Sequence, residues 1–117
     1  MYGYALSTAT KHDTSVKIGL GVHSGDHEIY PDCRPEFIAK MAEVLSICDY
    51  HKINFEAPFQ DLSKAEIIKV GLDMNLDYSK AWTCYEGKEK PCGKCSACLE
   101  RAASFKANQV NDPLDEL

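Results

Sequence analysis

Residues 82–98 read W-T-C-Y-E-G-K-E-K-P-C-G-K-C-S-A-C and place four cysteines in the pattern C-x7-C-x2-C-x2-C: Cys84, Cys92, Cys95 and Cys98. A C-x2-C step lets two thiolates face one ion, because the turn between them brings both sulfur atoms to the same side. Gly93 lies inside such a step and can adopt the positive φ that a tight turn often needs. The pattern predicts a closed metal site, and structural Zn2+ in tetrahedral geometry fits four cysteine ligands.

Other interpretations of these cysteines remain open. An iron–sulfur cluster also uses C-x2-C-x2-C spacing, although the C-x3-C-P continuation of the usual bacterial pattern is missing from the sequence. Disulfides are disfavoured because no signal-peptide pattern opens the sequence and cytosolic thiols stay reduced. A catalytic C-x2-C usually stands alone beside a βαβ pattern. Nearby lysines are expected to offset the negative charge of the thiolates: Lys88, Lys90 and Lys94.

The composition is that of an ordinary globular protein of at most one domain, with 117 residues, 44% of them hydrophobic and 26% charged. No stretch is apolar enough over a sufficient length to suggest a membrane segment. The net charge of −5 argues against a nucleic-acid partner, since phosphates require a basic surface. We expect a cytoplasmic protein with free thiols at Cys33 and Cys48, and a disordered tail over residues 108–117.

Hydrophobic periodicity predicts an alternation of helices and strands. Apolar residues alternate in two predicted strands, 16–22 and 53–57, and recur at helical spacing in four predicted helices: 2–12, 35–48, 64–74 and 96–107. The strand–helix–strand order predicts a parallel, right-handed βαβ unit. Two strands cannot bury helices on both faces of a sheet. The expected fold class is therefore α/β, with a partial doubly wound parallel sheet of Rossmann type, the cysteine loop and a C-terminal helix.

The loop over residues 21–34, G-V-H-S-G-D-H-E-I-Y-P-D-C-R, follows the first predicted strand. Ligands bind at the carboxyl ends of strands in open α/β sheets. By residue type alone, a simpler interpretation is open for both charged residues. Asp32 could merely interact with the positive N-terminus of the next helix, and Arg34 could be an ordinary surface residue. His23 and His27 could transfer protons, but a loop histidine is more often a polar surface residue. No base for a nucleophilic Cys33 is recognisable.

Two stretches together resemble one known family: G-V-H-S-G-D-H-E-I-Y-P-D-C-R-P-E-F (residues 21–37) and S-K-A-E-I-I-K-V-G-L…W-T-C-Y-E-G…P-C-G-K-C-S-A-C (residues 63–98). They look like the carboxyl-terminal half of the 7-cyano-7-deazaguanine synthases. That family comprises ATP-pyrophosphatases of the adenine-nucleotide α-hydrolase (HUP) type in the queuosine pathway. The resemblance implies one part of such an α/β domain over residues 1–107, with a zinc loop at 82–98 and one zinc held by the four cysteines.

The resemblance also implies a C–N-bond-forming ligase reaction, the ATP-dependent conversion of 7-carboxy-7-deazaguanine and ammonia to 7-cyano-7-deazaguanine. The carboxylate is adenylated, ammonia gives the amide, and a second activation allows dehydration. A carboxylate can grip the amidine-like edge of the base, and an arginine can pair with its carboxylate. The expected substrate-binding residues are Asp26, Tyr30, Asp32 and Arg34. Lys64 lies at the start of a predicted helix, where a positive charge is unfavourable. It is therefore a candidate phosphate contact; the alternative is an ordinary surface lysine.

The S-G-G-x-D-S pyrophosphate loop of the family does not occur in this sequence. We therefore expect a fragment or subunit that is inactive by itself and that needs a missing N-terminal half or assembles as a homo-oligomer. The alternative is a zinc-stabilised module that binds a deazapurine or a partner protein without turnover.

Overall fold

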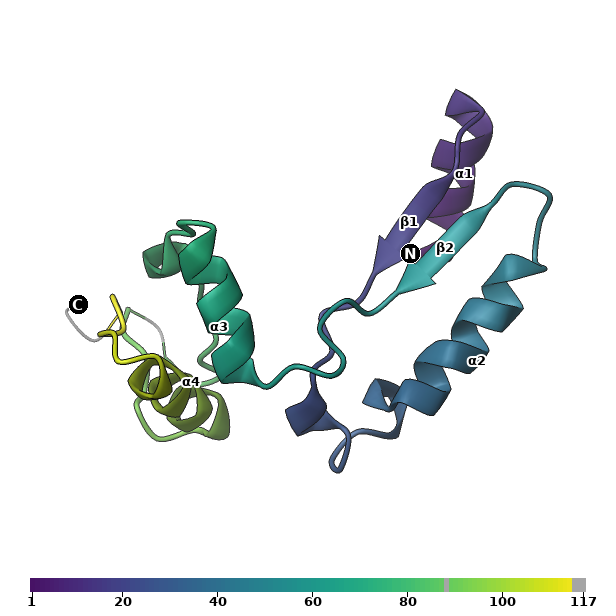
Figure 1. Cartoon of the computed structure of the whole chain (residues 1–117). Helices are drawn as coiled ribbons and strands as arrows, with labels where there is room; N and C mark the ends of the chain where they lie inside the picture. The colour runs from purple at the N-terminus through teal and green to yellow at the C-terminus, as the bar shows by residue number, and fades with distance from the viewer. Residues whose placement is uncertain (88, 115–117) are drawn as a thin grey trace. The chain divides into compact units, whose positions relative to one another are not determined.

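The protein is described from a computed structural model that places residues 1–87 and 89–114 (Figure 1). The chain divides into two compact units, residues 1–61 and 62–117, and each is considered by itself. The elements of the first unit are α1 (Tyr2–His12), β1 (Val16–Gly19), η1 (Ser24–Asp26), η2 (Pro31–Cys33), α2 (Pro35–Ser46) and β2 (Ile53–Glu56). Those of the second are α3 (Lys64–Asp73), η3 (Tyr78–Lys80) and α4 (Ser96–Ala107). The expectation that residues 1–107 form one part of a larger α/β domain stays a prediction.

Strands β1 and β2 form a two-stranded parallel sheet in which Val16 lies opposite Ile53. Helix α2 connects the two strands and packs against β2 (Figure 1). The predicted parallel βαβ unit is thereby confirmed. Both strands are shorter than predicted, because the ladder ends with the bond from the Leu20 amide to the Glu56 carbonyl oxygen (2.9 Å). Pro58, just beyond it, has no N–H with which to continue.

The core of the first unit forms around one face of this sheet. Ile18 and Ile53 are buried there together with Ala5 of α1 and Leu45 of α2. The intervening positions are polar, and Lys17 pairs with Glu56 across the strands at 3.0 Å. Parallel sheets are normally covered on both faces. The doubly wound arrangement of a larger sheet stays a prediction.

Helix α3 of the second unit begins at the capping box that the sequence predicts. The Ser63 hydroxyl accepts a hydrogen bond from the Glu66 amide (3.3 Å), and the Glu66 carboxylate accepts one from the Ser63 amide (2.7 Å). Helix α4 packs against α3, where the Asn108 side-chain amide donates to the Ala65 carbonyl oxygen at 2.8 Å. Both termini of α4 agree with the prediction. Among the described residues, no helix has the length and apolar character needed to cross a bilayer.

A buried ion pair holds the segment after α4. The guanidinium of Arg101 lies against the Asp112 carboxylate, which accepts hydrogen bonds from Nε and from Nη2, the latter at 2.7 Å. Both side chains are about 95% buried, and Leu114 is buried beside them. Asp112 thus supplies the carboxylate partner that a buried arginine requires, and the disordered tail expected over residues 108–117 stays a prediction. Residues 115–117 of that expected tail lie outside the described residues.

Candidate functional site

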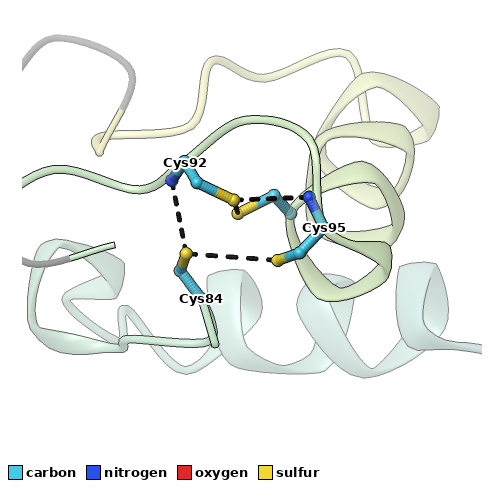
Figure 2. A group of neighbouring side chains, drawn as sticks. Cys84, Cys92 and Cys95 are labelled. Atoms are coloured by element: carbon cyan, nitrogen blue, oxygen red, sulfur yellow. Dashed lines mark hydrogen bonds between the residues drawn. The ribbon is translucent and has the colours of Figure 1, made fainter. Parts of the chain in front are cut away.

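The four predicted ligands converge in the second unit. Their Sγ atoms all lie within 4.8 Å of one another, and none of the six cysteines is disulfide-bonded. The Sγ atoms of Cys95 and Cys84 are 4.0 Å apart (Figure 2). Those of Cys92 and Cys98 are 3.9 Å apart. Around one Zn2+ with Zn–S bonds of about 2.3 Å, tetrahedral geometry separates the sulfur atoms by about 3.8 Å. The cluster therefore has the dimensions of a site for a single ion.

These dimensions also bear on the iron–sulfur alternative. In a cubane cluster each thiolate binds a different iron atom, so its cysteine sulfur atoms stand further apart than around one ion. Two of the four cysteines lie at the start of α4: Cys95 is its N-cap residue and Cys98 lies in its first turn. Helix geometry thus fixes the spacing of this pair, while Cys84 and Cys92 reach the cluster from the preceding loop (Figure 2).

Backbone amides point at the sulfur atoms. Cys84 Sγ accepts a hydrogen bond from the Cys92 amide (3.3 Å), and Cys92 Sγ accepts one from the Cys95 amide (3.3 Å) (Figure 2). Cys84 Sγ accepts a further hydrogen bond from the Gly87 amide (3.0 Å). The Cys92 amide is the largest cause that lowers the pKa of the Cys84 thiol to about 6, whereas burial raises the pKa of Cys98 to about 12. The Cys84 side chain thus favours the thiolate form, and the Cys98 thiol requires a nearby cation to ionise.

Two glycines shape the loop around the cluster. Gly93 has a φ of +69°, as the turn inside the C-x2-C step predicts. A Cβ at Gly87 would lie 2.2 Å from the Lys90 carbonyl oxygen and 3.1 Å from Cys84 Sγ, so only glycine fits there. Of the lysines expected to offset the thiolate charge, Lys94 lies 4.0 Å from Glu86. Lys88 lies outside the described residues.

The loop over residues 21–34 lies in the first unit, directly after β1. It is folded by η1 and η2, by the bond from the Tyr30 amide to the Asp26 carbonyl oxygen (2.9 Å), and by the bond from Arg34 Nε to the His27 carbonyl oxygen (2.9 Å). These turns bring the four expected substrate-binding residues onto one short, folded loop. Asp26 is half-buried, and the other three are exposed: Tyr30, Asp32 and Arg34.

Cys33 lies within the same loop and is a free thiol, as predicted. Burial raises the pKa of the Cys33 thiol, and the carboxylates of Asp32 and Asp26 raise it further. A thiol with a raised pKa is a poor nucleophile at neutral pH. The two carboxylates both act on this one sulfur, so the turns gather negative charge around it.

The histidines of the loop differ from the surface residues that sequence reasoning favours. His23 is only 6% exposed; its Nδ1 accepts a hydrogen bond from the Gly25 amide (3.1 Å), and its Nε2 lies 3.3 Å from Asp26 Oδ2. Nε2 of His27 is buried and has no hydrogen-bond partner among the described residues. The H-x-x-D spacing at a turn was the available signal for the His23–Asp26 pair.

Lys64, the candidate phosphate contact, forms an ion pair with Glu100 of α4. Only 26% of the lysine side chain is exposed. This partner offsets the unfavourable position of a positive charge at a helix start without invoking a ligand. A phosphate contact at Lys64 stays a prediction.

Comparisons with known proteins agree on one family. A family model described as queuosine biosynthesis protein QueC matches residues 1–109. The 7-cyano-7-deazaguanine synthase of Pseudoalteromonas atlantica is 50% identical over 113 residues, which cover 97% of this chain and 50% of the relative. The protein of that name from Caldicellulosiruptor saccharolyticus is 46% identical over 113 residues, covering 94% of this chain and 50% of the relative. The chain thus spans about half the length of the curated relatives it matches.

Proposed function

The chain belongs to the QueC family of queuosine biosynthesis proteins, and on that premise we propose that it forms part of a cytoplasmic 7-cyano-7-deazaguanine synthase. The activity is the ATP-dependent conversion of 7-carboxy-7-deazaguanine and ammonia to the nitrile. The observation that carries this proposal is the match of nearly the whole chain to synthases about 50% identical to it. The loop after β1 supports it, because ligands of open α/β sheets bind at the carboxyl ends of strands.

The loop supplies groups suited to the substrate. The Asp26 carboxylate accepts hydrogen bonds from the amidine-like edge of the base, and Arg34 pairs with the carboxylate at position 7. Tyr30 and Asp32 line the same loop. Adenylation joins a carboxylate oxygen of the substrate to the α-phosphate of ATP and releases pyrophosphate; ammonia then displaces AMP and leaves the amide. A second ATP activates the amide oxygen in the same way, and loss of that oxygen with AMP and of the amide protons leaves the nitrile. Arg34 contributes by orienting the reacting carboxylate, and Lys64 remains the candidate phosphate contact.

The four cysteines hold one Zn2+ in this proposal. The sulfur–sulfur distances near 4 Å, the amide hydrogen bonds and the absence of a fifth ligand among the described residues support a closed structural site. The ion then ties the start of α4 to the loop that carries Cys84 and Cys92. No step of the reaction passes through it.

The proposed partner is a polypeptide with the S-G-G-x-D-S loop, which completes the ATP site and adds strands to the sheet; a second copy of this chain is the alternative partner. In the described chain, β1 and β2 pair only with each other, which leaves sheet edges available for association. Alone, the chain is expected to self-associate and to leave ATP unhydrolysed.

Reconstitution tests this function. The chain is mixed with such a polypeptide, ATP, ammonium and 7-carboxy-7-deazaguanine, and the nitrile is measured by mass spectrometry. Product is expected from the mixture and from neither component alone. A monodisperse chain that hydrolyses ATP alone contradicts the proposed partner. Base binding without turnover in the mixture favours the alternative of a non-catalytic binding module.

A further inference from the structure

His23 is the N-cap residue of η1, and its ring is buried. Nδ1 accepts the hydrogen bond from the Gly25 amide, and a ring nitrogen that accepts a hydrogen bond carries no proton. In a neutral imidazole the proton then sits on Nε2. That nitrogen lies 3.3 Å from Asp26 Oδ2, so the two ring nitrogens face two different parts of the same turn.

We propose that His23 is a positioning residue for the substrate loop: a neutral imidazole protonated on Nε2 that fixes the η1 turn with one nitrogen and the Asp26 carboxylate with the other. The inference rests on the proposed function where it gives Asp26 the role of binding the base. A carboxylate held through Oδ2 presents Oδ1 in a fixed direction. Asp26 is then ordered before the base arrives, which lowers the entropic cost of binding.

The tautomer is measurable by long-range proton–nitrogen correlation spectra of the imidazoles in the reconstituted protein, with only the unsubstituted chain labelled with 15N. His51 serves as an internal contrast, because its Nδ1 lies 3.1 Å from Asp49 Oδ1 and its geometry favours a proton on Nδ1. At pH 7.5 His23 is expected as the Nε2–H tautomer and His51 as the Nδ1–H tautomer. An imidazolium or an Nδ1–H tautomer at His23 overturns the proposal.

Two variants separate the roles of the two nitrogens. In His23→Asn the side-chain oxygen replaces Nδ1 and keeps the bond to Gly25, but the contact with Asp26 is lost. In His23→Gln the amide nitrogen replaces Nε2 and keeps the reach to Asp26, but the turn loses its acceptor. His51→Asn is the matched control, since it removes a histidine–aspartate contact from the same unit outside the loop.

Binding of 7-carboxy-7-deazaguanine to the reconstituted protein is measured by calorimetry. His23→Asn is expected to weaken binding about tenfold, as for the loss of one hydrogen bond to a charged group, with an unchanged thermal midpoint. His23→Gln is expected to recover part of this loss, and His51→Asn to bind normally. Equal affinities for all four proteins, or a loss in His23→Asn that only follows a lower thermal midpoint, overturns the positioning role. If the unsubstituted protein does not bind the base, the proposed function fails, and the tautomer alone decides the role of His23.

Discussion

Replacing Asp112 by alanine leaves the Arg101 guanidinium buried without its carboxylate. Both side chains are at most 6% exposed, and Arg101 also donates to the carbonyl oxygens of Tyr78 and Ala81 and lies over the Phe105 ring at 5.2 Å. Breaking a buried ion pair by removing one partner costs about 3–5 kcal/mol. Because the two carbonyl oxygens remain as acceptors, we expect the lower end, about 3 kcal/mol. Small domains are stable by only about 5–15 kcal/mol, so the loss is large.

Urea unfolding of the metal-loaded chain measures this loss. The single tryptophan, Trp82, belongs to the same unit and donates from Nε1 to the Cys84 carbonyl oxygen at 3.0 Å, so its fluorescence reports on that unit. The midpoint is expected to fall by about 1 M or more, given slopes of about 1–3 kcal/mol per M. Asp73→Ala is the matched control in the same unit: it breaks a pair with Lys69 in which both side chains are at least 66% exposed, worth about 0.5 kcal/mol. If Asp112→Ala costs no more than Asp73→Ala, the buried pair does not hold the segment after α4.

The same carboxylate makes stability depend on pH. Burial alone raises the pKa of Asp112, but the hydrogen bonds from Arg101 and from the Leu114 amide outweigh it and hold that pKa below its ordinary value. A depressed folded-state pKa stabilises the protein above the unfolded value of about 3.9, and this contribution disappears as the pH falls through the folded-state value. Acid also releases metal from thiolates. The difference in stability between the unsubstituted chain and Asp112→Ala isolates Asp112, and it is expected to shrink below about pH 4.

Three further predictions concern the metal, the substrate and the loop glycine. Purified chain is expected to contain about one zinc, which Cys92→Ser should lose and Cys48→Ser, the control, should keep. Elemental analysis that finds iron, or a fold that survives chelation unchanged, contradicts the zinc assignment. Arg34→Ala should weaken binding of 7-carboxy-7-deazaguanine to the reconstituted protein by roughly 1.5–3 kcal/mol and leave binding of the nitrile unchanged, with Lys40→Ala as the control. Equal losses of affinity for both ligands in calorimetry mean that Arg34 has only a structural role. Gly87→Ala should lower metal affinity in chelator competition, because its Cβ meets the Lys90 carbonyl oxygen at 2.2 Å, whereas Gly3→Ala, in open space, should not; equal affinities refute the steric argument.

Local spacing determined what the sequence alone predicts well. The C-x2-C steps bring sulfur atoms together through single turns, and the capping box operates within four residues, so both follow from a short stretch of chain. Hydrophobic periodicity predicts α1 and α4 with their observed bounds. The parallel pairing of β1 and β2 follows from the helix between them.

Only the tertiary structure decided which polar side chains are buried and what they meet. Arg101 pairs with Asp112, which lies beyond the end of α4, and Lys64 pairs with Glu100 of another helix, so the periodicity of a single helix predicts neither pair. His23 was expected at the surface, and the turns that follow β1 bury it. Burial is a collective result of packing, since a side chain leaves water only when several segments close over it. A polar residue inside is tolerated only where that same packing supplies its partners.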